Sequence, residues 1–149
     1  MTMTFRGLAF IAFAGAALAA QPALAKDIIV QMKNQGTAGV MVFEPTFVKA
    51  EVGDTVHFVP TDMGHNAETI PAMLPADVDP SKGGMNKEFI LKLTKPGLYG
   101  IKCLPHYSMG MVALVQAGKG PSANLAAVRA ASLPPLAARR LAPYLAQAK

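Results

Sequence analysis

The chain contains little cysteine and little histidine. Its 149 residues include one cysteine, Cys103, and three histidines. A single cysteine excludes a disulfide bond within the chain, which leaves four roles for Cys103: a buried inert residue, a reactive thiol, half of an intermolecular bridge, or a metal ligand. The residues near Cys103 in the sequence indicate which of these roles applies.

Long hydrophobic runs are also scarce. The apolar run LAFIAFAGAALA, residues 8–19, is shorter than the roughly 20 residues of a membrane-spanning helix, and no later segment is apolar enough to cross a membrane. Arg6 precedes this run and Ala23-Leu24-Ala25 follows it, which is typical of a cleaved export signal. We therefore predict a signal peptide over residues 1–25, export of the protein, and a mature protein that starts at Lys26 and does not associate with a membrane.

Strand signals fill most of the mature chain up to residue 117. Apolar and polar residues alternate in several short segments. These segments are DIIVQM (27–32), FVKAEV (47–52), TVHFV (55–59), FILKL (89–93) and MVALV (111–115). Turn-forming residues separate them, and the pattern lacks the long helices that connect the strands of a parallel sheet. We predict the all-β class, with an antiparallel sandwich or barrel.

The composition changes after residue 117. Residues 118–149 are rich in alanine, leucine and arginine, and 122–131 and 135–148 are predicted to form two short helices. Pro143 is expected to kink or end the second helix, because proline has no N–H to donate. The residues expected to cover part of the sandwich are Leu125, Val128, Leu141 and Leu145. The mature chain is thus predicted to be one domain, with a sandwich over residues 26–117 and a helical tail.

Chemically distinctive residues gather in IKCLPHYSMGMV, residues 101–112. Strand side chains alternate between two faces, so Cys103 shares the face of Tyr99 and Ile101 and enters the core at the end of the strand if they do. His106 and Met111 follow in the next loop. Cysteine, histidine and methionine are therefore expected to converge at one end of the sandwich.

The other two histidines differ in their context. His65 lies in the turn-rich segment PTDMGHNAE, from which a loop side chain can reach the same end. His57 lies between Val56 and Phe58 in a predicted strand, so alternation turns it away from the core and we interpret it as a solvated surface residue. Two histidines, a cysteine and a methionine form the donor set of a blue copper electron-transfer site, since thiolate and thioether suit Cu(I) and imidazole suits Cu(II). Zinc does not need a thioether.

Three other functions compete with electron transfer. An enzyme that uses Cys103 as a nucleophile and a histidine as base leaves Met111 unexplained. A multicopper oxidase or reductase needs more copper sites than three histidines can supply. A periplasmic protein for copper delivery or storage stays open as the alternative, because the same ligands bind Cu(I).

The mature chain resembles the cupredoxin family of blue copper proteins over essentially its whole length. The resemblance rests on MVFEP (41–45), GDTVHFVPTDMGHN (53–66), KCLPHYSMGMVAL (102–114) and the two terminal helices. The Cys-x₂-His-x₄-Met spacing alone would also fit a plastocyanin-like protein, whereas PHYSMGM and the helical tail favour the cupredoxins that end in helices. The resemblance implies a Greek-key β-sandwich with two short C-terminal helices, one type 1 copper ion, and a soluble periplasmic one-electron carrier that is not an enzyme.

The resemblance also assigns roles to residues. The copper ligands that it implies are His65, Cys103, His106 and Met111, with Met109 as the competing methionine. It implies three residues that tune the site from outside the ligand set. Asn66 would direct its backbone N–H at the cysteine sulfur and tie the two ligand loops together. Pro105 would lie beside the solvent-facing histidine, and Met41 near the same ring.

Redox partner proteins follow from the same resemblance. It implies a copper nitrite reductase or another periplasmic reductase as electron acceptor, a cytochrome-type donor, and a monomeric carrier. Lys82 and Lys102 match positions in a ring of lysines around the exposed histidine, while Gln35 and Met63 stand where that ring has lysine in relatives. The formal net charge of the sequence is +5 and its basic residues are dispersed, so nucleic acid is not an expected partner.

Overall fold

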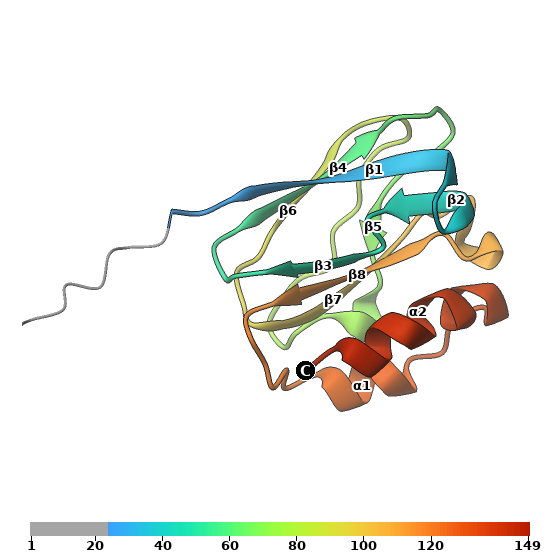
Figure 1. Ribbon diagram of the computed structural model, residues 1–149. Helices are drawn as coiled ribbons and strands as arrows, with labels where there is room; N and C mark the ends of the chain where they lie inside the picture. The colour runs from blue at the N-terminus through green and yellow to red at the C-terminus, as the bar shows by residue number, and fades with distance from the viewer. Residues whose placement is uncertain (1–23) are drawn as a thin grey trace, which may run out of the picture.

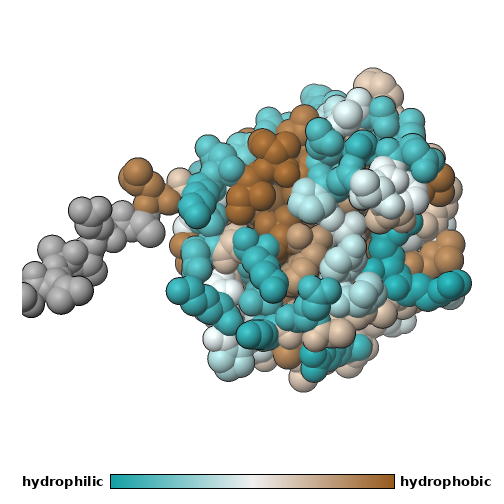
Figure 2. Space-filling model, viewed as in Figure 1, coloured by the Kyte–Doolittle hydropathy of each residue, from teal (hydrophilic) through white to brown (hydrophobic). Residues whose placement is uncertain are grey.

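The computed structural model describes residues 24–149 and shows two four-stranded sheets packed face to face, with two helices on the outside of one of them (Figure 1). The predicted signal peptide lies outside the described residues except for its last two positions, so it stays a prediction. Within residues 24–149, no helix is both long enough and apolar enough to span a membrane. In the view of Figure 2, hydrophilic residues cover most of the surface, and a hydrophobic patch shows between the two sheets.

The first sheet has the strand order β2-β1-β4-β6. Its strands are β1 (Asp27–Gly36), β2 (Gly39–Glu44), β4 (Thr55–Pro60) and β6 (Phe89–Lys92). The predicted alternation in β1 is confirmed, since Val30 and Met32 are buried and Ile29 is exposed. This sheet therefore buries one face and leaves the other face to solvent, as its period of two residues predicts.

The second sheet has the strand order β3-β8-β7-β5. Its strands are β3 (Phe47–Ala50), β5 (Glu68–Thr69), β7 (Gly97–Lys102) and β8 (Val112–Ala117). Two short 3₁₀ helices, η1 (Pro71–Met73) and η2 (Tyr107–Met109), lie in the connections. The predicted strand over residues 47–52 is too long, because the chain turns after Ala50 and leaves Val52 about half exposed in the turn.

The expectation of a purely antiparallel sandwich is wrong for two strand pairs. β1 pairs with β4 in parallel, and β3 pairs with β8 in parallel. From β2 to β7, consecutive strands alternate between the two sheets, as β3 does between β2 and β4. The chain can thus return to the first sheet in a parallel direction by way of the second sheet, so no helical crossover is needed and the sequence contains none.

The core between the sheets is built from alternating strand residues. Phe43 of β2 and Phe58 of β4 are fully buried, and their ring centroids lie 5.4 Å apart in an edge-to-face arrangement. Tyr99, Ile101 and Cys103 are also fully buried in this cluster. The alternation argument that placed Cys103 inside the sandwich is therefore confirmed, and the cysteine begins the loop directly after β7.

The tail forms two helices, α1 (Leu125–Ala130) and α2 (Pro135–Gln147), which cover the outer face of the second sheet (Figure 1). Val128 and Leu141 are buried there against Leu98, Val112 and Leu114 in a second apolar cluster. All of β8 is buried as a consequence, because the helices cover one of its faces and the first sheet covers the other.

Pro143 does not end the second helix, since α2 continues through it to Gln147. Pro143 leaves the carbonyl of Arg139, four residues earlier, without its helical partner. Arg139 is exposed, so water can satisfy that carbonyl. Leu141 before the proline is fully buried and Leu145 after it is partly buried, and this packing holds both parts of the helix on the sheet.

Candidate metal centre

The candidate site lies at the end of the sandwich where β4 and β7 end and β8 begins, on the right in Figure 1. The loop after β4 carries His65, and the loop between β7 and β8 carries Cys103 and His106. Two loops from opposite sheets therefore bring together residues that are far apart in the sequence.

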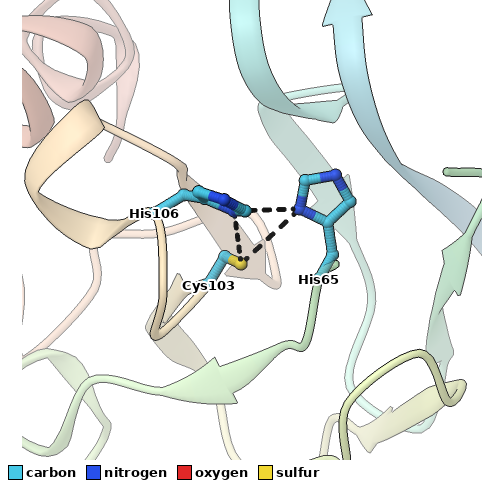
Figure 3. Close-up of side chains that lie close together, drawn as sticks. All are labelled: His65, Cys103 and His106. Carbon is cyan, nitrogen blue, oxygen red and sulfur yellow. Dashed lines mark hydrogen bonds between the residues drawn. The ribbon is translucent and has the colours of Figure 1, made fainter. Parts of the chain in front are cut away.

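Three donor atoms form a compact triangle (Figure 3). The Cys103 Sγ lies 3.8 Å from His65 Nδ1 and 3.6 Å from His106 Nδ1, and the two Nδ1 atoms are 3.2 Å apart. Bonds of about 2.0 Å to imidazole nitrogen and about 2.3 Å to thiolate sulfur would hold such atoms roughly 3–4 Å apart around one first-row metal ion. The triangle therefore has the size of a single metal site.

His65 is fully buried and held by a hydrogen bond on its far side. Its Nε2 lies 3.0 Å from the Oδ1 of Asn34, which is in β1. An amide oxygen can only accept, so Nε2 carries the proton and Nδ1 is left free to bind a metal. Burial, together with the neighbouring His106, lowers the pKa of His65, so the ring is neutral as metal binding requires.

Cys103 is enclosed by backbone groups and apolar residues. Its N–H donates to the carbonyl of Met111 at 3.0 Å, which closes the loop between β7 and β8. Burial raises the pKa of the thiol, whereas the backbone N–H groups of Asn66 and His106 act in the opposite direction. These two N–H groups are positioned to stabilise negative charge on the sulfur, as it carries when it binds a metal.

Asn66 links the two ligand loops, as the resemblance implies. Its Oδ1 accepts from the N–H of Leu104 at 2.7 Å. Its Nδ2 donates to Glu68 Oε2 at 3.2 Å and to the carbonyl of Gly83 at 3.3 Å. The amide is therefore fixed on both ends, which holds the His65 loop against the Cys103 loop.

The two candidate methionines are placed differently. Met111 is fully buried in the inter-sheet core beside Cys103, and its N–H donates to the carbonyl of His106 at 3.1 Å. Met109, in η2, is 41% exposed. Met41 is partly buried against the same core and has a positive φ of 48°. The burial of Met111 favours it over Met109 as the fourth ligand.

His106 is the histidine that reaches the surface. It is partly exposed, whereas His65 is fully buried. Its neighbours Leu104 and Pro105 are exposed, as is Met109. These three exposed apolar residues flank His106 in the sequence, and we call His106 together with them the His106 face.

Both predicted docking lysines contact one buried carboxylate that sequence reasoning missed. Lys82 Nζ lies 3.6 Å and Lys102 Nζ 3.3 Å from the carboxylate of Glu68, whose side chain is 10% exposed. Lys102 Nζ also lies 5.0 Å from the ring centroid of Tyr107. Lys82 remains 65% exposed and Lys102 only 20%, so Lys82 is the more accessible positive charge.

His57 takes no part in this site. Its Nδ1 lies 2.6 Å from Glu88 Oε1 and its Nε2 lies 3.2 Å from Asp27 Oδ1. These carboxylates raise its pKa, chiefly through the hydrogen bond with Glu88. It is thus near the surface, as predicted, but paired with two acidic residues rather than simply solvated.

The types of donor atom in the site indicate which metal it binds. Among residues 24–149, the one cluster of histidine, cysteine or acidic residues that can surround an ion is His65, Cys103 and His106, and it contains no carboxylate. A hard cation such as Mg²⁺ or Ca²⁺ would require oxygen ligands. Two imidazoles and a thiolate, with a buried thioether next to them, fit copper.

Comparison with known proteins supports the same conclusion. Residues 30–118 match the family of copper-binding proteins described as plastocyanin/azurin. The chain is 49% identical to a pseudoazurin of Paracoccus pantotrophus over 145 residues, which covers 97% of this chain and 99% of the relative. It is 44% identical to a pseudoazurin of Methylorubrum extorquens over 146 residues, covering 97% and 98%.

A solved structure extends the likeness to three dimensions. The crystal structure of pseudoazurin from Methylobacterium extorquens is similar with a TM-score of 0.78 at 45% identity, over 81% of this chain and 98% of that one. The Greek-key cupredoxin sandwich with two C-terminal helices is therefore confirmed. The chain belongs to the copper-binding plastocyanin/azurin family and, within it, to the pseudoazurins, which carry single electrons on one type 1 copper ion and are not enzymes.

Proposed function

We propose that this protein is a monomeric periplasmic carrier that takes single electrons from a cytochrome-type donor and delivers them to a copper nitrite reductase or another denitrification enzyme. The export pattern of residues 1–25 supports the location. The observation that carries the rest is the His106 face, where a partly exposed ligand histidine lies in a loop whose neighbouring apolar residues are also exposed. A partner that covers this face comes within contact distance of a ligand ring.

The residues have separate tasks in this proposal. His65, Cys103, His106 and Met111 would hold copper, which supplies the one-electron Cu(II)/Cu(I) couple when bound. Asn34 orients the ring of His65, and Asn66 fixes the distance between the two ligand loops. The apolar core around Cys103 excludes water from the sulfur.

The remaining predicted residues act at the surface. Pro105 has no N–H, so it offers no hydrogen bond to the neighbouring His106 ring. Met41 is partly buried against the core between the sheets. Lys82 and Lys102 would attract an acidic partner. Weak, small contacts suit a carrier that must dissociate after each transfer.

A charge placed on the His106 face tests the proposal. Leu104→Lys introduces a charged group into the proposed contact, and Ile90→Lys makes the same change on β6 at nearly equal exposure, 48% and 50%. Stopped-flow mixing of the reduced protein with copper nitrite reductase, at high salt to suppress long-range attraction, gives the second-order rate constant. We expect Leu104→Lys to lower it about tenfold, the equivalent of losing about 1.4 kcal/mol at a contact centre, and Ile90→Lys to leave it unchanged.

Equal rates for the two variants would place the contact elsewhere on the protein. Failure of the wild type to reduce the enzyme at all would reject this acceptor, while leaving one-electron transfer at the copper site intact.

A further inference from the structure

Arg140 connects the helical tail to the ligand loop. It lies on α2, and its Nη1 donates to the carbonyl of Gly110 at 2.6 Å and to that of Met41 at 2.7 Å. Its Nη2 donates to the carbonyl of Val40 at 3.1 Å. One guanidinium thus joins α2, β2 and the loop that carries His106 and Met111.

These bonds define the environment of Arg140. The side chain is partly buried, and burial lowers its pKa. Within residues 24–149, no carboxylate forms a salt bridge with it, and it makes three hydrogen bonds to carbonyl groups. Hydrogen bonds from a charged donor are stronger than neutral ones, and the planar fork of arginine can reach several carbonyls at fixed angles.

Gly110 is where α2 and the ligand loop touch. It has a φ of +85° and caps η2, and a Cβ built on it would lie 2.9 Å from the backbone oxygen of Leu136. The backbone of α2 therefore rests directly on the loop, one residue before Met111. Movement of Gly110 away from Arg140 would displace the start of β8, including the Met111 amide that bonds to His106.

We propose that Arg140 is a positioning residue for the copper site, which holds the segment Gly110–Met111 at a fixed distance from Val40 and Met41. The inference rests on the proposed role of Met111 as copper ligand. It assigns to the helical tail a role in setting the geometry of a site to which the tail contributes no ligand.

The first test uses the reduced, copper-loaded protein and follows its backbone amides, so it requires no partner. Arg140→Met removes the charged fork and keeps an apolar stem, and Arg139→Met is the control on the exposed neighbour. Hydrogen exchange is followed at the amides of Cys103 and Met111, with the amide of Phe58 in β4 as the reference for global unfolding. We expect exchange at Cys103 and Met111 to accelerate at least about tenfold relative to Phe58 in Arg140→Met, as loss of a charged hydrogen bond implies, and not in Arg139→Met.

The second test separates position from charge in the copper-loaded protein. Arg140→Lys keeps the positive charge but cannot reach three carbonyls with one planar group. We expect both Arg140→Lys and Arg140→Met to change the intensity ratio of the thiolate-to-copper absorption bands and the reduction potential, with Arg139→Met matching the wild type. Equal acceleration of exchange at Phe58 and Met111, or wild-type spectra and potentials in both Arg140 variants, would overturn the proposal. Neither readout involves nitrite reductase, so failure of the proposed acceptor leaves this test unaffected.

Discussion

Asn34 shows how one uncharged side chain selects the reactive nitrogen of a histidine. The two ring nitrogens of His65 are equivalent in sequence terms, yet only Nδ1 faces Cys103. The amide oxygen of Asn34 accepts from Nε2, which fixes the tautomer and the rotation of the ring together. The hydrogen bond thus keeps Nε2 protonated and leaves Nδ1 directed at the sulfur, where a metal can bind it.

The two methionines near the site allow a prediction at the residue scale. Met111→Gln replaces a soft buried thioether with a harder oxygen donor, which favours Cu(II), so we expect the reduction potential to fall. Met109→Gln is the matched control, because its side chain lies at the exposed rim, and we expect its potential to stay close to that of the wild type. Voltammetry of both variants measures the difference. A larger fall for Met109→Gln would assign the fourth ligand to Met109 instead.

Among the secondary structure elements, the parallel pair β1–β4 carries a polar cluster on its solvent face. His57 of β4 lies between Asp27 at the start of β1 and Glu88 just before β6. The three residues come from three neighbouring strands of the first sheet or their ends. Within residues 24–149, no helix covers the outer face of this sheet, so the cluster is the kind of interaction that can stabilise its exposed side.

This cluster predicts a pH-dependent stability. Because the pKa of His57 is raised in the folded protein, its contribution is complete below the unfolded value of about 6.5 and is lost as the pH rises through the folded value. His57→Gln should therefore lower the free energy of unfolding more at pH 6 than at pH 8.5. Chemical denaturation of the copper-loaded protein at both pH values measures this. If His57→Gln lowers the free energy of unfolding more at pH 8.5 than at pH 6, the protonated His57 does not stabilise the fold as we predict.

Local sequence patterns predicted much of the fold and of the metal site. The features that they did not predict depend on contacts between residues far apart in the sequence. The period of two residues correctly placed Cys103 in the core after β7, and donor chemistry grouped it with His65 and His106. Asn34 lies 31 residues from His65 and in a different strand, so no local spacing could indicate their contact. The parallel strand pairs could not be predicted either, because side chains alternate between the two faces in the same way in parallel and antiparallel strands.

At the scale of the whole molecule, the proposed copper site and the helical tail lie on different parts of the sandwich. The copper site and the His106 face occupy one end of the sandwich, and the helices cover the outer face of the second sheet (Figure 1). The positive charge of the two proposed docking lysines is partly neutralised, because Lys82 and Lys102 both contact Glu68. Charge is therefore expected to assist the encounter with a partner rather than to determine the final contact.

Lys82 provides the corresponding prediction. Lys82→Glu should slow electron transfer to an acidic copper nitrite reductase at low salt by roughly two- to fivefold, equivalent to the ~0.4–1 kcal/mol of an exposed charge pair. The difference should shrink as salt is raised from about 0.01 to 0.15 M, because the screening length falls from about 30 to 8 Å. Lys92→Glu, on β6, is the matched control for net charge. Identical salt curves for Lys82→Glu and Lys92→Glu would exclude docking near Lys82.

The contact between Gly110 and the backbone of Leu136 has a consequence for protein engineering. The segment from Cys103 to Met111 looks like an exchangeable cassette, because it begins and ends at strands and carries three of the four proposed ligands. Its inner side, however, is shaped to fit α2, where a single added Cβ would approach a carbonyl oxygen to 2.9 Å. A cassette taken from a cupredoxin without a helical tail would therefore collide with α2 or lose its support. Transplants into this scaffold should keep the glycine and the arginine facing it, or replace the tail together with the cassette.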